Sequence, residues 1–339
     1  MIIRHVILLN STILLTTVLL FRHNMNTQNA RGVINMPLDA LQDKIARLKK
    51  ECRAIILAHN YQPEEIQDCA DYIGDSFELS RIAADSDAAV IVFCGVHFMA
   101  ESAAILAPGK TVLLPELAAG CPLADMISPE ELREFKQKHP GAAVAAYINS
   151  SAAVKAESDV CVTSANAVEV INSLQEERVI FVPDCNLADF VSKHTTKEII
   201  PWQGYCITHH RVYPEDIQKA RRLHPQAIVI VHPECRPEVV ALADYALGTG
   251  GMIRFVRETE HQEIIVGTEL GMIYRLRKEC PDKKFYLLST GLVCPNMKYT
   301  TLEKVVWSLE NMEHKIAVAP EIAEKAARAL QRMLDVPVH

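Results

Sequence analysis

The sequence predicts an α/β fold of three repeated three-layer αβα units, with parallel sheets placed around a pseudo-threefold axis. Two observations predict this fold. Short, continuous apolar runs alternate with amphipathic segments, which is typical of parallel strands buried on both faces between helices. One segment also occurs three times in the same order, and an internal repeat of this kind indicates equivalent units that pack on one another.

The three copies share a strand that is followed by polar residues. The first copy reads AIILAHNYQ (54–62), the second AAVAAYINS (142–150) and the third AIVIVHPEC (227–235). Each copy closes on a cysteine, and Cys121, Cys206 and Cys294 lie 85 and 88 residues apart. Because equivalent loops of units around one axis converge on it, we expect the three thiols to meet at one point.

The remaining elements follow from the same two patterns, in chain order. Strands are predicted for six apolar runs: IILA (55–58), VIVFC (90–94), VAAY (144–147), VIFVP (179–183), IVIVH (228–232) and IIVGT (264–268). Amphipathic helices are predicted at 37–51, 129–140, 214–225, 300–312 and 320–335, the last with a proline in its first turn. The predicted organisation is an N-terminal extension (1–36), three repeats (37–120, 121–205 and 206–298) and C-terminal helices (299–339) that pack on the first repeat.

Composition narrows the class of protein. The chain has 339 residues, of which 49% are hydrophobic and 23% charged, as in an ordinary globular protein. The net charge of −7 and the lack of a basic run give no support for nucleic-acid binding. Ten cysteines are too few for a disulfide scaffold in a chain of this length. They suit the reducing cytoplasm, where thiols are buried or bind metal.

The N-terminus carries an apolar run, VILLNSTILLTTVLLF (6–21). The run is shorter than the roughly 20 apolar residues of a spanning helix, so membrane contact is not expected. Two interpretations remain. The run is either a signal peptide, although no A-x-A cleavage site follows it, or the product of an upstream start codon, with translation beginning at Met25 or Met36. We favour the second, since export would suit a reduced metal site poorly.

Polar residues follow the strands in the same register. Two sets of equivalent residues do so: His59, Tyr147 and His232, and Tyr61, Asn149 and Glu234. In parallel α/β units, ligands bind beyond the carboxyl ends of the strands. Three such ends in register predict one shared cleft. His209, three residues after Cys206, is expected to face the same cleft.

A third equivalent set consists of small hydroxyl residues at predicted helix starts: Ser76, Ser164 and Thr249. Such residues are expected to cap the free backbone N–H groups of the first helical turn. Helix starts also bind anions through these N–H groups and the helix dipole. The set therefore predicts a ligand rich in carboxylate or phosphate groups, even though the protein itself is acidic.

The three cysteines predict a metal centre with an incomplete protein shell. Structural zinc is normally closed by four ligands, so three thiolates leave a position open for a substrate. Soft thiolates favour an iron–sulfur cluster, Cu(I) or zinc. A [4Fe–4S] cubane on Cys121, Cys206 and Cys294 would leave one iron free to act as a Lewis acid, which suits the loss of a hydroxyl group as water.

Six short motifs stand in order along the chain together with the three cysteines: AHNYQ (58–62), GDSFEL (74–79), FMAE (98–101), TSANAV (163–168), VHPEC (231–235) and TGGM (249–252). Taken together they resemble the quinolinate synthase family, from residue 37 to the C-terminus. The resemblance implies a three-domain, pseudo-threefold α/β fold with a [4Fe–4S] cluster at its centre. It also implies condensation of iminoaspartate with dihydroxyacetone phosphate to quinolinate, with loss of phosphate and two waters, in NAD biosynthesis from aspartate. An L-aspartate oxidase is the implied supplier of the imine.

The resemblance also assigns roles to residues. The family's cluster ligands match Cys121, Cys206 and Cys294. Its substrate-binding positions match His59, Ser76, Tyr147, Asn149, Ser164, His209, His232, Glu234 and Thr249. Tyr61 and Glu234 are predicted to relay protons, and His59 and His232 to move protons near neutral pH. The family has a serine before TGGM where this chain has Gly248, so we expect weaker substrate binding.

Two other classes of protein fit the same residues. A different hydro-lyase or a zinc enzyme would use the same three thiols, and its metal content would separate it from an iron–sulfur enzyme. A non-catalytic anion-binding or redox-sensing protein would explain the helix starts and the thiols. It would not explain why Tyr61 and Glu234 are expected in the same cleft.

Overall fold

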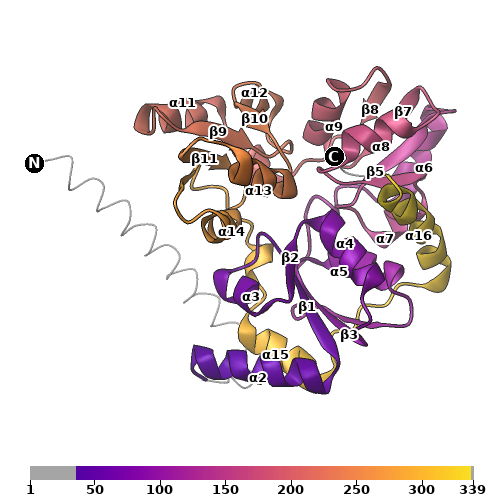
Figure 1. The fold of residues 1–339 in the computed structure, drawn as a ribbon. Helices are drawn as coiled ribbons and strands as arrows, with labels where there is room; N and C mark the ends of the chain where they lie inside the picture. The colour runs from indigo at the N-terminus through magenta and orange to yellow at the C-terminus, as the bar shows by residue number, and fades with distance from the viewer. Residues whose placement is uncertain (1–35, 337–339) are drawn as a thin grey trace, which may run out of the picture. The chain divides into compact units, whose positions relative to one another are not determined.

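Each of the three repeats forms a four-stranded parallel sheet, and the strand order is the same in all three (Figure 1). The computed structural model describes residues 36–336. The two interpretations of the apolar run 6–21 lie outside the described residues. The sheet orders are β2-β1-β3-β4, β6-β5-β7-β8 and β10-β9-β11-β12. An α/β fold with helices between parallel strands is therefore confirmed.

The strands of each sheet come from one repeat. The first sheet contains β1 (Ala54–His59), β2 (Tyr72–Gly74), β3 (Val90–Cys94) and β4 (Thr111–Leu113). The second contains β5 (Ala143–Tyr147), β6 (Val160–Val162), β7 (Arg178–Val182) and β8 (Glu198–Pro201). The third contains β9 (Ile228–Val231), β10 (Tyr245–Ala246), β11 (Glu263–Gly267) and β12 (Lys284–Leu287).

The six predicted strands are the two central strands of each sheet. Their apolar runs are buried on both faces, as the burial of all five residues of β3 and of β5 shows. The edge strands were not predicted, because they hold only two to four residues and carry no apolar run. Tyr72 in β2 and Tyr245 in β10 are even exposed.

Helices connect the strands in every repeat. The first repeat contains α2 (Leu38–Glu51), α3 (Glu64–Cys69), α4 (Ser76–Asp85) and α5 (His97–Leu106). The second contains α6 (Pro129–Lys138), α7 (Ala152–Ala156), α8 (Ala167–Ser173) and α9 (Cys185–Ser192). The third contains α10 (Ile207–His210), α11 (Pro214–Leu223), α12 (Pro237–Val240), α13 (Thr249–Glu258), α14 (Gly271–Glu279) and the 3₁₀ turn η1 (Asn296–Lys298). The chain ends with α15 (Leu302–Asn311) and α16 (Pro320–Leu334).

Two sets of equivalent side chains form the same hydrogen bonds in all three repeats. Three aspartates accept the backbone N–H of a residue in the first strand of their own repeat, each at 2.7 Å: Asp71 from Ile56, Asp159 from Val144 and Asp244 from Val229. Three lysines donate to backbone carbonyls at the ends of α4, α8 and α13: Lys110, Lys197 and Lys283. The helix dipole favours a cation at these ends.

The two C-terminal helices pack on different repeats. Helix α15 lies beside α2, where Lys44 and Glu310 form an ion pair of 2.7 Å. Helix α16 packs mainly against α7 and β6 of the second repeat and also contacts α5 of the first (Figure 1). The expectation that both helices pack on the first repeat therefore covers only part of the contacts of α16. Its apolar face, with Ala326, Ala329 and Leu330 fully buried, is long enough to reach two repeats.

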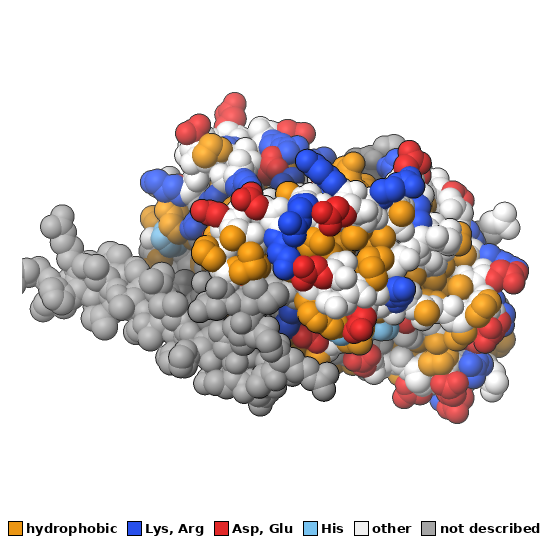
Figure 2. Space-filling model, turned by 90° about the horizontal axis from the view of Figure 1, so that it is seen from below, with side chains coloured by type: hydrophobic (Ala, Val, Ile, Leu, Met, Phe, Trp, Pro, Cys, Tyr) orange, Lys and Arg blue, Asp and Glu red, His pale blue; other side chains and the backbone are white. Residues whose placement is uncertain are grey.

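The described surface carries charges of both signs. On the face seen in Figure 2, Lys and Arg side chains are interspersed with Asp and Glu. Within residues 36–336, no helix combines the length and the apolar character that crossing a membrane requires.

Candidate metal centre and active site

One cavity of about 240 Å³ brings together residues of all three repeats. Its lining includes all three predicted cysteines, Cys121, Cys206 and Cys294. It also includes every other predicted site residue: His59, Tyr61, Ser76, Tyr147, Asn149, Ser164, His209, His232, Glu234 and Thr249. The carboxyl ends of equivalent strands supply the first members of this set, since His59 ends β1, Tyr147 ends β5 and His232 follows β9.

The three cysteines lie in loops that follow the last strand of each sheet. Cys121 follows β4, Cys206 directly precedes α10, and Cys294 lies just before η1. All three thiols are free. Burial raises the pKa of the Cys121 thiol to about 12, and it also raises the pKa values of Cys206 and Cys294. Each of the three would therefore release a proton on binding a metal.

The donor set fits a thiolate-bound metal group. All three thiols line the same cavity. Thiolates are the ligands of iron–sulfur clusters, Cu(I) and zinc. A second donor set overlaps the first, because donor atoms of Cys206, His209 and Glu234 all lie within 4.8 Å of one another. The choice of metal therefore depends on which set is used.

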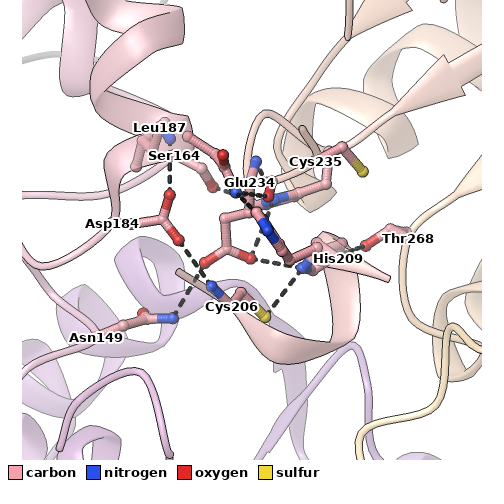
Figure 3. A network of polar contacts seen from close by, with 12 residues as sticks. Asn149, Ser164, Asp184, Leu187, Cys206, His209, Glu234, Cys235 and Thr268 are labelled. Carbon is pink, nitrogen blue, oxygen red and sulfur yellow. Dashed lines mark hydrogen bonds and ion pairs between the residues drawn. The ribbon is translucent and has the colours of Figure 1, made fainter. Parts of the chain in front are cut away.

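Glu234 is the centre of the polar network in the cavity (Figure 3). Its Oε2 lies 2.7 Å from Nδ1 of His209 and 3.3 Å from Nδ1 of His232. Burial alone would raise the pKa of Glu234, but the two histidines lower it below its usual range. Asn149 Nδ2 approaches Oε1 of the same carboxylate at 3.5 Å. The buried Glu234 is therefore a carboxylate held by neighbours from two repeats.

Tyr61 is linked to Glu234 through two intervening side chains. The Tyr61 hydroxyl lies 2.6 Å from Oγ1 of Thr268, which lies 2.9 Å from Nε2 of His209. His209 then reaches Glu234 through Nδ1, and this nitrogen also lies 3.2 Å from the Cys206 sulfur. Burial raises the pKa of Tyr61 well above its usual value, so its hydroxyl keeps its proton.

Two buried histidines flank this network. Burial, together with His232, lowers the pKa of His59 to about 3, and burial also lowers the pKa of His232. His59 Nδ1 accepts the backbone N–H of Tyr61 at 3.2 Å, which leaves Nε2 as its proton-bearing nitrogen. A histidine with such a pKa does not titrate near pH 7. A pKa of about 3 keeps His59 neutral at pH 7, with Nε2–H as its hydrogen-bond donor.

The hydroxyl residues lie at or near helix starts but do not cap them. Asp75 caps α4, with its Oδ1 accepting the N–H groups of Phe77 and Glu78, whereas Ser76 is the first residue of the helix. The residue before α13 is Gly248, which has no side chain to cap with, and Ser164 lies before Asn166, the residue that precedes α8. The capping prediction was wrong, because the capping position lies one residue earlier in α4 and α13 and two residues later in α8.

Two of these hydroxyl groups, which cap no helix, instead form hydrogen bonds with side chains around the cavity. Ser164 Oγ lies 3.2 Å from Nε2 of His232. Thr249 Oγ1 accepts a hydrogen bond from Nδ2 of Asn60 at 3.0 Å. These contacts cross from one repeat to another. The hydroxyls therefore belong to the site, although not for the reason expected from the sequence.

Sequence reasoning missed Thr268 and two carboxylates, Asp184 and Glu269. Thr268 and Glu269 follow β11 as Pro183 and Asp184 follow β7, at a spacing of 85 residues. The register of the repeat was thus a signal for the carboxylate pair. No pattern in the sequence marks Thr268 itself, because neither Pro183 nor Gly95 at the equivalent positions carries a hydroxyl.

Comparison with known proteins identifies the family. A model of the family described as "Quinolinate synthetase A protein" matches residues 43–335. The chain belongs to the quinolinate synthase family. A family member from Dehalococcoides mccartyi (strain CBDB1), named quinolinate synthase, is 60% identical over 298 residues, which cover 88% of this chain and 99% of the relative.

Two further relatives of the same name extend the comparison. The protein of Methanoregula boonei is 55% identical over 294 residues, covering 87% of this chain and 97% of its own length. That of Caldicellulosiruptor bescii is 51% identical over 302 residues, covering 89% of this chain and 100% of its own. The family therefore spans the three sheets and the whole cavity.

Proposed function

We propose that this protein is a quinolinate synthase of de novo NAD biosynthesis, which condenses iminoaspartate with dihydroxyacetone phosphate and releases phosphate and two waters. The observation that carries the proposal is that three free thiols, one from the loop after the last strand of each sheet, line a cavity together with ten further polar residues of the predicted set. Membership of the quinolinate synthase family supports it.

The proposed cofactor is a [4Fe–4S] cluster held by Cys121, Cys206 and Cys294 at a pseudo-threefold axis. The equal strand order of the three sheets supports this arrangement. When bound, such a cluster would supply an open iron that polarises a hydroxyl or carboxylate of the substrate. All ten cysteines, which lie within the described residues, are free, and this supports a reducing compartment, for which we propose the cytoplasm.

Proton transfer is assigned to a row of four side chains: Tyr61, Thr268, His209 and Glu234. The Tyr61 hydroxyl donates to Thr268, the Thr268 hydroxyl to Nε2 of His209, and Nδ1–H of His209 to Glu234, at the distances given above. Thr268 and His209, in the middle of this row, can each accept on one side and donate on the other. A proton taken from a substrate carbon or added to a leaving hydroxyl can therefore be passed along the row, which suits a reaction with two dehydrations.

Binding of the substrate's anionic groups is assigned to two helix starts and to the side-chain amide of Asn149. Ser76 and Thr249 begin α4 and α13, and the start of α13, which has no side-chain cap, offers N–H groups and a helix dipole that favour a carboxylate or phosphate. Tyr147, Asn149 and Ser164 add donors from the second repeat. His59 and His232, both neutral, would donate to or accept from the triose portion without adding charge.

The substrates define the partners of the enzyme. Iminoaspartate hydrolyses readily because it is an imine, so a steady supply is required. We propose an L-aspartate oxidase as its source, in line with the resemblance of the sequence. No residue of the described surface is assigned to such a contact.

Metal analysis of protein purified without oxygen tests the proposal. We expect about four irons and four sulfides per chain, the content of one cubane, and formation of quinolinate from the two substrates. Cys121→Ser should lose the iron and the activity. Cys69→Ser is the matched control, because this thiol lies outside the cavity and donates only to the carbonyl of Ile66.

Zinc is the alternative that a specific observation favours. Cys206, His209 and Glu234 form a donor set of mixed type that zinc accepts. Zinc without iron in protected protein, retained in Cys121→Ser and lost in Glu234→Gln, would overturn the iron–sulfur assignment and favour a zinc enzyme on the same fold.

A further inference from the structure

Two buried carboxylates each bind the backbone of a cysteine in the cavity. Asp184 Oδ2 accepts the N–H of Cys206 at 3.0 Å (Figure 3), and Glu269 Oε1 accepts the N–H of Cys294 at 3.1 Å. Both side chains belong to fully buried residues, with 0% of their surface exposed. They lie 85 residues apart, directly after β7 and β11 in equivalent loops.

The second oxygen of each carboxylate binds the start of a helix. Asp184 Oδ1 accepts the N–H of Leu187 in α9 at 2.7 Å, and Glu269 Oε2 accepts the N–H of Gly271 in α14 at 2.7 Å. Each carboxylate therefore connects a cysteine loop to the first turn of a helix in the same repeat. Because that helix packs on its own sheet, the cysteine is fixed relative to the sheet.

The first repeat shows that the fold does not require this carboxylate. Val96 occupies the equivalent position, 88 residues before Asp184. In all three repeats one backbone bond joins the same two loops: His97 to Ala119, Cys185 to Gly204 and Leu270 to Leu292, each at 2.8 Å. The carboxylates are thus an addition, present in two repeats, to a connection that the fold already makes.

A buried carboxylate is costly unless hydrogen bonds compensate for the lost water. Burial and the nearby Glu234 raise the pKa of Asp184 well above its usual value, and the N–H groups that Asp184 accepts act against this rise. In the third repeat, Lys298 Nζ lies 3.0 Å from Glu269 and also donates to the backbone carbonyl of Tyr61. The two carboxylates have in common that each accepts the backbone N–H of a cysteine, whereas their other neighbours in the core differ.

We propose that Asp184 and Glu269 are positioning residues that hold the backbones of Cys206 and Cys294 so that both thiolates point at one metal group. This inference rests on the proposed three-thiol metal centre. It adds two residues that act through the backbones of the cysteines, one of which, Glu269, also lines the cavity. Cys121 has no such carboxylate, and the carbonyl of Gly120 directly before it accepts a hydrogen bond from Nδ2 of Asn296 at 2.8 Å.

The test is the rate at which a chelator removes iron from the anaerobic holoenzyme of Asp184→Asn. Asparagine caps a helix as well as aspartate does, so it keeps the bond to Leu187 and leaves the N–H of Cys206 without its acceptor. We expect iron release to be about 10- to 100-fold faster, the usual effect of losing a partner that orients a metal ligand. Glu269→Gln should act in the same direction through Cys294.

Asp159→Asn is the matched control. Asp159 also accepts a backbone N–H, that of Val144 at 2.7 Å, but at the amino end of β5 rather than beside the cavity. Its iron release should equal that of the wild type. The electron paramagnetic resonance signal of the reduced protein is the second readout, because a displaced thiolate changes this signal and a general loss of stability does not.

The outcomes separate this inference from the proposed function. If the wild type holds about four irons per chain, and both carboxylate variants release iron at the rate of the control with an unchanged signal, the positioning role is wrong and the proposed function stands. If the wild type holds no iron, both are overturned. Faster release in either carboxylate variant, with the control unchanged, supports the inference.

Discussion

At the scale of single residues, the side chain of Glu234 contacts residues of two repeats in the cavity. Histidines on two sides keep its carboxylate ionised, and Asn149 reaches it from the second repeat. Asn186 binds its backbone carbonyl at 3.0 Å, so the residue is fixed at the main chain as well. A change of charge at this one position therefore affects proton transfer without moving the cysteines.

Glu234→Gln tests the proton row. Glutamine keeps the size of the side chain but cannot take up a proton from His209. We expect iron and sulfide content to stay at the wild-type level while turnover falls by about 100-fold or more, the range for loss of a general acid or base. Glu238→Gln, a surface change four residues further on, should leave both unchanged. Wild-type turnover in Glu234→Gln would rule out this role.

The buried histidines make stability depend on pH. His59 has a pKa of about 3 in the folded protein but about 6.5 in the unfolded chain. Below pH 6.5 the unfolded chain binds a proton that the folded protein does not. The free energy of unfolding therefore decreases by about 1.4 kcal/mol for each unit by which the pH is lowered. This loss continues toward pH 3.

Urea unfolding of the metal-free protein at pH 7 and pH 5 measures this effect. The wild type should lose about 2 kcal/mol more than His59→Asn between the two values, because only the wild type buries this histidine in neutral form. Equal losses in the two proteins would show that His59 is not the group responsible.

Gly248 lies so close to the cavity that a Cβ atom added there would contact a site residue. A Cβ there would lie 2.9 Å from Oγ of Ser164, which must then turn away from His232. We expect Gly248→Ala to raise the KM about fivefold, the equivalent of one hydrogen bond, with kcat nearly unchanged. In Gly251→Ala the new Cβ meets only Leu247 at an ordinary 3.5 Å, so this variant should keep the wild-type KM. If the two variants behave alike, the effect does not come from Ser164.

At the scale of elements, each repeat has a lysine, directly before the last strand of its sheet, that binds carbonyls at the end of one helix. Lys283 Nζ donates to the carbonyls of Val256 and Thr259 at the end of α13, where the helix leaves carbonyls without partners. Lys110 and Lys197 do the same for α4 and α8. This contact lies far from the strand ends that carry the site, so it serves stability alone.

Lys283→Met should lower the free energy of unfolding by about 1–3 kcal/mol, because two carbonyls lose a charged donor while the aliphatic packing is kept. Iron content should not change. Lys284→Met is the control, since the neighbouring lysine pairs only with the surface carboxylate of Glu263 and should matter little. Urea unfolding of both variants measures the difference, and equal stabilities would contradict a capping role for Lys283.

At the scale of the whole molecule, one metal group would join three repeats. A ligand that binds only the folded chain stabilises it in proportion to its affinity and concentration. Removal of the metal with a chelator should therefore lower the melting temperature of the wild type. It should leave that of Cys121→Ser unchanged, because this variant holds no metal to lose. Thermal melts with and without chelator give the comparison, and an equal fall in both proteins would point to an effect of the chelator itself.

Much of this architecture follows from the sequence, and the exceptions have physical causes. The six central strands and the residues around the cavity were predictable because buried strands leave continuous apolar runs and the repeat fixes which polar residues are equivalent. The short edge strands leave no such run. Asp75 was missed as a cap because Ser76 beside it has equal local preference, and only the three-dimensional structure distinguishes the two. Thr268 has no counterpart in the other repeats.

The wide spacing of the three cysteines has a consequence for how the enzyme matures. A growing chain has no complete donor set until residue 294 has been made, and three separate sheets must then assemble before the thiols meet. Bringing together loops so distant in the chain is slow compared with the folding of a single repeat. Loading of the proposed metal group would therefore follow the assembly of all three sheets, and a chain that stops after two repeats would lack part of the donor set.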